Sequence, residues 1–75
     1  MTLGDVIKNV NPQGSLLIEY RTIVEGIDFF AGICRYEDGN LLSLDGDNYS
    51  LDDEIYKYGE GTAVTGEKML TVWYK

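Results

Sequence analysis

The sequence predicts an α+β fold, in which a short N-terminal helix packs on a four- to five-stranded antiparallel sheet. Three observations lead to this class. Apolar residues near the N-terminus recur at helical spacing, later segments alternate apolar and polar residues, and turn-forming pairs such as Asp38-Gly39 separate them. A sheet with one apolar face needs a helix to cover it. With 75 residues, the chain has room for a single small globular domain, residues 1–75.

The helix is expected over residues 2–10. Thr2 and Asp5 stand three residues apart, as in a capping box, where each side chain binds the backbone N–H of the other residue. Pro12 should end the helix, since proline disfavours helical backbone at the residue before it. The apolar face that would dock on the sheet consists of Leu3, Val6, Ile7 and Val10.

Two strands should follow, over residues 15–21 and 27–36. The first alternates strictly, which is typical of a strand with one buried face. The second carries apolar residues on both faces. We therefore expect either a central strand or a strand that contacts the helix on one side and another subunit on the other. Gly26 and Gly32 are expected to mark a bend or a bulge.

The pair Asp38-Gly39 predicts a type I′ turn, because aspartate and glycine both tolerate a positive φ. We expect this turn to close a hairpin whose second strand covers residues 41–44. A polar loop over 45–48 should follow, because aspartate, glycine and asparagine cluster there.

The segment after this loop allows two interpretations. Ser50 followed by Asp53 suits the start of a helical turn, whereas the residues that follow suit a strand, which we place at about 54–58. The glycines of 59–61 predict a connecting loop. Alternation over 69–74 predicts the last strand.

The net charge of −7 is confined to one third of the chain. Residues 37–60 hold eight carboxylates against one base, Lys57, whereas the remaining residues balance five acids with five bases. Such a surface attracts cations and basic proteins and repels the phosphates of nucleic acid. We therefore expect a protein partner with a basic surface and no direct nucleic-acid binding. The eight acids are Glu37, Asp38, Asp45, Asp47, Asp52, Asp53, Glu54 and Glu60.

The composition disfavours several classes of function. With one cysteine and no histidine, the chain forms neither an internal disulfide nor a cysteine–histidine nucleophile pair. Cys34 lies within an apolar run and is expected to be buried. No apolar stretch is long enough to cross a bilayer and no signal peptide is visible, so we expect a cytoplasmic protein that does not bind membranes.

Two kinds of carboxylate chemistry fit the acidic segment poorly. An EF-hand beginning at Asp45 needs glycine in sixth place and glutamate in twelfth, where the chain has Ser50 and Tyr56. Glycoside hydrolysis needs two carboxyls across a cleft, which a domain of this size seldom provides. No nucleotide-binding, nucleophile-elbow or zinc motif is present. We expect no enzyme, no catalytic residue, no metal and no cofactor.

Aromatic residues near the acidic segment suggest a protein interface, because tyrosine and tryptophan combine a large rigid surface with a polar group. Tyr74 belongs to this aromatic set, although some of its rings should instead fill the small core. The acids expected to steer a partner are Asp45, Asp47, Asp52, Asp53 and Glu54, and the rings expected to anchor it are Tyr49, Tyr56, Tyr58 and Trp73.

Two sequence segments in the C-terminal half are distinctive, namely NYSLDDEIYKY at 48–58 and LTVWY at 70–74. Together with the short opening helix, they resemble small uncharacterised proteins of bacterial prophages and conjugative elements. The resemblance implies a mobile-element setting, where small acidic proteins often act by occupying host proteins. Some of these inhibitors, including anti-CRISPR and antirestriction proteins, imitate DNA with carboxylates on a rigid scaffold. The resemblance implies no active site.

Two functions are therefore expected. The first is a non-catalytic protein-binding module that uses the acidic, tyrosine-bearing surface of residues 37–60. The second is a DNA-mimicking inhibitor of a host nucleic-acid enzyme, for which duplex DNA would compete. A homodimer is compatible with both, because pairing of an edge strand or of a spare apolar face would bury what one small layer leaves exposed.

Overall fold

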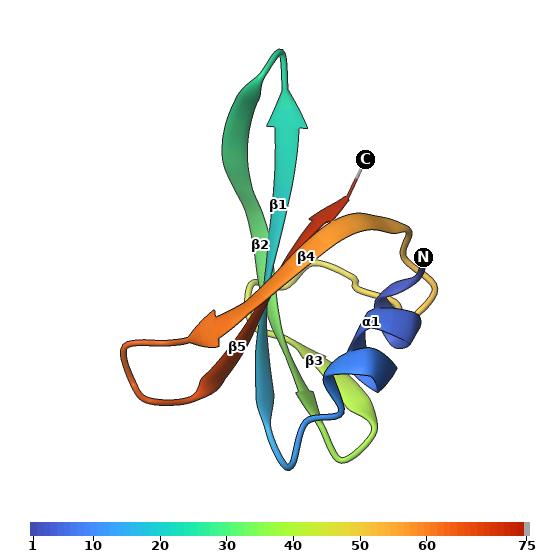
Figure 1. Cartoon of the computed structure of the whole chain (residues 1–75), viewed down its shortest axis with the longest axis vertical. Coiled ribbons are helices and arrows are strands. Elements are labelled where there is room, and N and C mark those ends of the chain that lie inside the picture. Colours follow the sequence, from blue (N-terminus) through green and yellow to red (C-terminus); the bar gives the residue numbers. More distant parts are fainter. Residues whose placement is uncertain (75) are drawn as a thin grey trace.

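The computed structural model describes residues 1–74, and within them the chain forms one helix and five strands. Helix α1 (Leu3–Val10) lies against one face of the sheet, and the hairpin of β1 and β2 extends beyond the other elements (Figure 1). The prediction of an α+β fold is confirmed. No helix within residues 1–74 has the length and apolar character needed to span a membrane. The strands are β1 (Leu16–Val24), β2 (Ile27–Glu37), β3 (Asn40–Ser43), β4 (Ile55–Thr62) and β5 (Lys68–Tyr74).

Helix α1 begins and ends as its sequence predicts. The Thr2 hydroxyl accepts a hydrogen bond from the Asp5 backbone N–H at 3.2 Å, and the Asp5 carboxylate accepts one from the Thr2 N–H at 3.1 Å. This confirms the capping box. Asn11 closes the helix in the left-handed conformation, with a φ of 50°, directly before Pro12.

The sheet has the strand order β3-β2-β1-β5-β4. β1, β2 and β3 form an antiparallel meander, and β4 and β5 form a second antiparallel hairpin. β5 lies parallel to β1, with Leu17 opposite Met69 and Arg21 opposite Trp73. The prediction of a purely antiparallel sheet is therefore wrong. The segment after β3 crosses to the far edge of the sheet, so the last hairpin enters with β5 beside β1 and running in the same direction.

Two tight turns with positive φ at both central residues join the first three strands. Asp38 and Gly39 have φ of 52° and 81°, as a type I′ turn requires, which confirms the predicted hairpin. Glu25 and Gly26, with φ of 51° and 78°, also form a tight turn with positive φ, at the position where the sequence analysis expected a bend or a bulge. This turn lets β1 continue to Val24, three residues past its predicted end.

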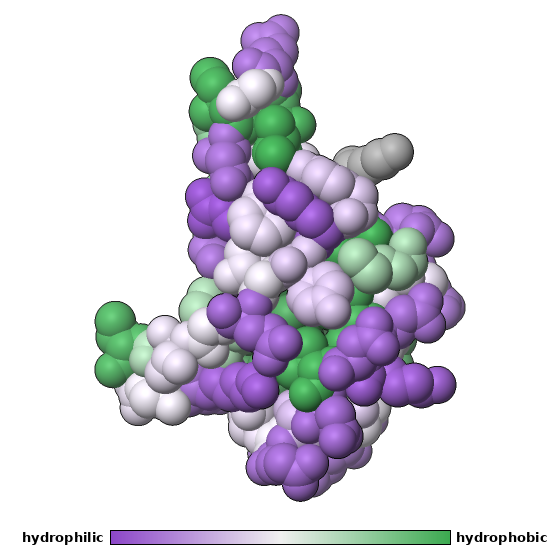
Figure 2. Space-filling view, viewed as in Figure 1, coloured by the Kyte–Doolittle hydropathy of each residue, from purple (hydrophilic) through white to green (hydrophobic). Residues whose placement is uncertain are grey.

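A bulge interrupts the pairing of β1 with β2. Tyr20 lies opposite Gly32 and Arg21 lies opposite Phe30, which leaves Ala31 as the extra residue. The predicted bulge is thus present one residue before Gly32, whereas Gly26 serves in the turn. A bulge shifts the alternation of side chains by one residue. Apolar residues of β2 therefore appear on both faces, and those of the outer hairpin are exposed (Figure 2).

β4 is longer than predicted, because it includes residues 59–61, which the sequence analysis assigned to a loop. These residues pair with β5 up to the Thr62–Lys68 pair. β4 is an edge strand, where glycine is tolerated, and the pairing with β5 outweighs the low strand propensity of glycine. Ser50 does begin a turn, since its carbonyl accepts from the Asp53 N–H at 3.1 Å.

The core lies between α1 and the face of the sheet that the helix covers. Every apolar residue predicted for the helix face is buried, and so is Cys34, as predicted. β1 and β5 supply most of the sheet residues of the core, since they are neighbouring strands in the interior of the sheet. The buried residues are Leu3, Val6, Ile7, Val10, Leu16, Ile18, Tyr20, Cys34, Ile55, Leu70 and Val72.

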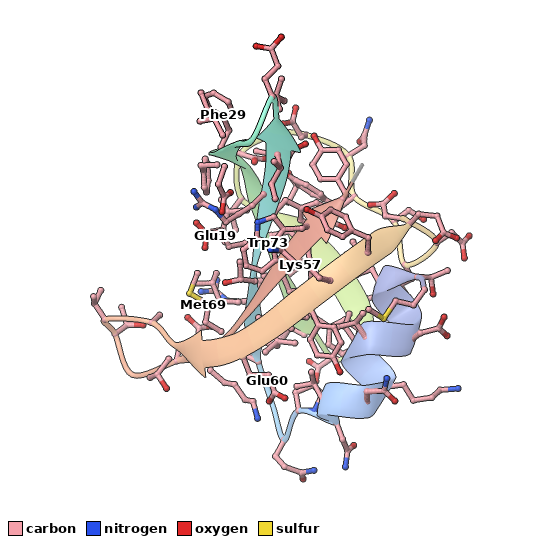
Figure 3. The ribbon with its side chains drawn as sticks, turned by 45° about the horizontal axis from the view of Figure 1, so that its top comes forward. Glu19, Phe29, Lys57, Glu60, Met69 and Trp73 are labelled. Carbon is pink, nitrogen blue, oxygen red and sulfur yellow. The ribbon has the colours of Figure 1, made fainter. Side chains whose placement is uncertain are left out.

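The opposite face of the sheet carries a network of charged and aromatic side chains. Arg21 binds the carboxylates of Glu19 and Asp28, each at 2.8 Å. On neighbouring strands, the ammonium of Lys57 lies 4.5 Å from the ring centre of Trp73 (Figure 3). These contacts let a face without a covering layer remain in water.

The position of β5 inside the sheet predicts a large cost for shortening its buried side chains. Leu70→Ala should lower the free energy of unfolding by about 2–5 kcal/mol, because it leaves a cavity between α1 and the sheet. Leu42→Ala, on the edge strand β3 and 47% exposed, should cost about 1 kcal/mol or less. Urea denaturation measures both values, and equal losses would contradict the interior placement of β5.

Candidate functional site

A cleft of about 450 Å³ opens on the helix side of the sheet, at the foot of the β1–β2 hairpin. Its size is in the range of sites that hold a small molecule or a protruding side chain. Three tyrosine rings and three carboxylates line it. Among the described residues, the lining includes no lysine or arginine. The lining residues are Tyr20, Ala31, Asp47, Asn48, Tyr49, Asp53, Glu54 and Tyr74.

The three tyrosines come together from distant parts of the chain. Tyr20, in the middle of β1, and Tyr74, at the end of β5, occupy the helix-side face, and because these strands are neighbours the two ring centres lie 5.8 Å apart. Tyr49 belongs to the 44–54 segment that joins β3 to β4, and its ring centre lies 4.7 Å from that of Tyr20. Tyr20 therefore forms the floor on which the other two rings pack.

Asp45 fixes one end of the 44–54 segment to the sheet. One carboxylate oxygen accepts hydrogen bonds from the Ile33 N–H of β2, at 2.9 Å, and from the Tyr49 hydroxyl. The other oxygen accepts from the Asp47 N–H at 3.0 Å and the Ser43 hydroxyl at 3.2 Å. These donors, led by the Tyr49 hydroxyl, lower the pKa of Asp45 from about 3.8 to about 2.

Helix α1 and β1 fix the other end of the segment. The N–H groups of Leu3 and Gly4 donate to the carbonyls of Asp53 and Leu51, each at 2.8 Å. These donors belong to the first turn of the helix and have no partner within it. The Asp53 carboxylate also accepts a hydrogen bond from the Tyr20 hydroxyl at 2.8 Å. The segment is thus attached both to β1, which lines the cleft through Tyr20, and to the first turn of α1.

The hydroxyls of Tyr20 and Tyr49 are hydrogen-bond donors and remain protonated. Burial, followed by the hydrogen bond to Asp53, raises the pKa of Tyr20 well above its usual value. Burial and the bond to Asp45 raise the pKa of Tyr49 in the same way. The Cys34 thiol lies in the core between α1 and the sheet, and burial raises its pKa to about 12. Near neutral pH, Tyr20 and Tyr49 therefore do not supply a phenolate base, and Cys34 does not supply a thiolate nucleophile.

The structure brings four of the nine predicted site residues into the cleft, namely Asp47, Tyr49, Asp53 and Glu54. Glu54 also lies 3.4 Å from the N-terminal ammonium of Met1. Asp45 lies beside the cleft, where it anchors the segment instead of facing a partner. The acidic residues that the sequence analysis placed together therefore have different roles, since some line the cleft and Asp45 holds the 44–54 segment in place.

The other four predicted residues lie outside the cleft. Asp52 is exposed in the turn before β4, and Tyr56 is 43% exposed near the N-terminus. Tyr58 packs against the core. Trp73 lies on the opposite face of the sheet, beside Lys57. None of these four residues lines the cleft.

The sequence analysis missed three lining residues, which are Tyr20, Ala31 and Asn48, and it included Tyr74 in the aromatic set without choosing it as an anchor. A signal for Tyr20 was present, because it ends the buried face of β1 where leucine and isoleucine precede it. A buried tyrosine needs a partner for its hydroxyl, which points to a polar group nearby. That group, Asp53, is 33 residues away in the sequence.

Comparisons of the chain with protein-family models, with curated proteins and with solved structures found no match. Within residues 1–74, no group of three or more carboxylate or thiol side chains is arranged to hold a metal ion. Support for a functional site therefore comes from the shape and chemistry of the cleft.

The contact between Gly32 and Tyr49 predicts that glycine is required at position 32. A Cβ at this buried position would collide with the Tyr49 hydroxyl, so Gly32→Ala should lower the free energy of unfolding by about 1–3 kcal/mol. Gly59→Ala is the matched control, since a Cβ there meets nothing within 4 Å, and its effect should stay within about 0.5 kcal/mol. Urea denaturation of both variants checks this. Equal effects would contradict the described placement of Tyr49.

The lowered pKa of Asp45 predicts a stabilisation that depends on pH. Because the pKa is lower in the folded protein than in the unfolded chain, the contribution is complete above about pH 4 and is lost as the pH falls toward about 2. Asp45→Asn should therefore have a lower Tm than the wild type at pH 7, and the difference should shrink between about pH 4 and about pH 2. Thermal melts followed by circular dichroism measure this. A difference that is constant over the whole range would contradict the assignment.

Proposed function

We propose that the protein is a non-catalytic binding module whose acidic, tyrosine-lined cleft receives a basic side chain of a partner protein. One observation carries the proposal: three tyrosine rings and three carboxylates converge on one cleft, and its lining includes no base among the described residues. The carboxylates are those of Asp47, Asp53 and Glu54.

The chemistry of the lining suits a lysine or an arginine side chain. Aromatic rings attract cations through their electron-rich faces, and carboxylates pair with ammonium and guanidinium groups. The long alkyl stem of a basic side chain would pack on the rings, while its charged end would reach the carboxylates. Tyr20 and Tyr49 are fixed by hydrogen bonds to Asp53 and Asp45, so these side chains lose little conformational entropy on binding.

The remaining acids of residues 37–60 would act at longer range. They add to the negative potential of the molecule, which raises the rate of encounter with a basic surface. The setting we propose is the cytoplasm of a bacterium that carries a mobile element. The resemblance of 48–58 and 70–74 supports the mobile element, and a single cysteine without a disulfide suits a reducing compartment.

Imitation of DNA receives less support from the geometry. A mimic presents carboxylates as an outward row, with one charge for every ~1.7 Å of duplex axis. Four of the eight acids of residues 37–60 instead bind groups of the same chain, and three of them line or support a concave site. The four are Asp45, Asp53, Glu54 and Glu60.

Selection from a displayed library of peptides of about 12 residues tests the proposal. The enriched peptides should contain lysine or arginine, and replacement of that residue by norleucine should weaken binding. Asp47→Asn combined with Glu54→Gln removes two of the three carboxylate charges of the cleft while conserving its shape, and should weaken binding of the selected peptide by about tenfold or more. Isothermal titration calorimetry at about 50 mM salt measures these affinities.

A matched variant separates the cleft from the general field of the acidic segment. Glu37→Gln combined with Asp52→Asn also removes two negative charges, but from exposed positions outside the cleft. This variant should weaken binding by less than about threefold. Equal losses in both double variants, or selected peptides without a basic residue, would contradict recognition of a basic side chain in the cleft.

A further inference from the structure

The outer half of the β1–β2 hairpin carries a concentrated group of exposed apolar side chains. They lie directly below the polar tip of the hairpin (Figure 2). Each is between 41% and 57% exposed, although large apolar side chains on a soluble protein are normally scattered. The five residues are Ile23, Val24, Ile27, Phe29 and Phe30.

These side chains project from both faces of the hairpin. Val24 lies opposite Ile27, and Ile23 lies opposite Asp28. Since successive residues of a strand point to opposite faces, the first pair and the second pair lie on different sides. A hairpin that is apolar on both sides cannot be covered by folding back onto its own sheet. Its surface is therefore suited to contact with another molecule.

The edge of β2 along this hairpin is open. β3 pairs with β2 only from Cys34 onward, so no strand of residues 1–74 flanks positions 27–32 on that side. In a hairpin with a two-residue turn, the closing pair of residues exchanges hydrogen bonds, and so does every second pair after it. Asp28 and Phe30 belong to the pairs in between, so their backbone N–H and C=O groups point away from β1. An open edge of this kind readily pairs with another strand.

The usual protection of an open edge is missing here. Natural sheets block exposed edges with lysine, proline or inward-pointing charges. Positions 27–32 contain one charged residue, Asp28, whose carboxylate is occupied by Arg21 at 2.8 Å and by the Trp73 indole N–H at 3.2 Å. Arg21 also lowers the pKa of Asp28, which therefore stays ionised and paired. The edge thus presents backbone and apolar groups to a partner, and it carries little unpaired charge.

We propose that the β1–β2 hairpin joins two copies of this chain, with the open edge of β2 pairing antiparallel to the same edge of the second copy. Antiparallel pairing of one edge with itself is two-fold symmetric, as most homodimers are. The five side chains expose on the order of 500 Å² per copy. Pairing of the β2 edges would cover part of this area, mainly at Ile27, Phe29 and Phe30. The interface is therefore smaller than the ~800 Å² per partner of a standard specific interface and suits a dimer that forms at high protein concentration.

The distribution of charge favours a second copy over other occupants. The acidic residues 37–60 lie outside the hairpin, whose own charges are the Arg21–Asp28 pair and Glu25 at the tip. Two hairpins therefore approach without placing the acidic segments against each other. An anionic membrane surface would instead repel a molecule of net charge −7.

Sedimentation velocity over about 1–500 µM protein tests this proposal. The wild type should change with concentration from the 8.4 kDa monomer to a species of twice that mass. Ile27→Thr combined with Phe30→Thr should weaken dimerisation by about tenfold or more, because threonine keeps strand propensity while removing apolar area. Val64→Thr removes a fully exposed apolar side chain elsewhere and should dimerise like the wild type.

Hydrogen exchange on the wild type gives a readout that does not depend on the folding of a variant. The amides of Asp28 and Phe30 should be protected at high protein concentration and exchange rapidly at low concentration. A wild type that remains monomeric throughout, or a double variant that is folded and dimerises equally well, would overturn the proposal. A monomer that binds phosphatidylcholine vesicles through the hairpin would also overturn it. None of these outcomes affects binding at the cleft, which is measured separately with peptides.

Discussion

Hydrogen bonds at both ends of the 44–54 segment determine how the rest of the molecule is assembled. Asp45 binds the backbone of β2, and the first turn of α1 donates to the carbonyls of Leu51 and Asp53. The segment is thereby stretched across the helix side of the sheet, from the β3 edge to the β4 edge. Because it crosses in this way, β5 enters beside β1, the core is completed, and one wall of the cleft is formed. The strand order and the candidate site have the same physical cause.

Local patterns were reliable where neighbouring residues determine the structure. The Thr2–Asp5 capping box, the Asp38-Gly39 turn and the alternation of 69–74 each depend on contacts within a few residues, and each is confirmed. The parallel pairing of Leu17 with Met69 joins residues 52 positions apart, and no local pattern specifies such a partner. For the same reason, β4 extends through glycines that locally favour a loop.

The candidate site was only partly accessible to sequence analysis. Acidic and aromatic residue types could be identified, and Asp47, Tyr49, Asp53 and Glu54 do line one cleft. Trp73 follows Val72 in the chain but points to the other face of the sheet, because alternation separates neighbours in a strand. Tyr20 joins the cleft through packing with Tyr49, which depends on the path of the 44–54 segment. Side-chain chemistry was therefore predictable, whereas the grouping of side chains depended on topology.

Complete burial of the thiol of Cys34 makes this side chain an internal reporter of opening motions. A thiol reagent needs an exposed thiolate, and Cys34 lies in the core with its pKa raised to about 12. Labelling therefore has to wait until β2 separates locally from the core, or until the whole chain unfolds. Since the chain contains no second cysteine, each labelling event comes from one known place in the sheet. The labelling rate would then report how often the core beneath the cleft becomes accessible to solvent.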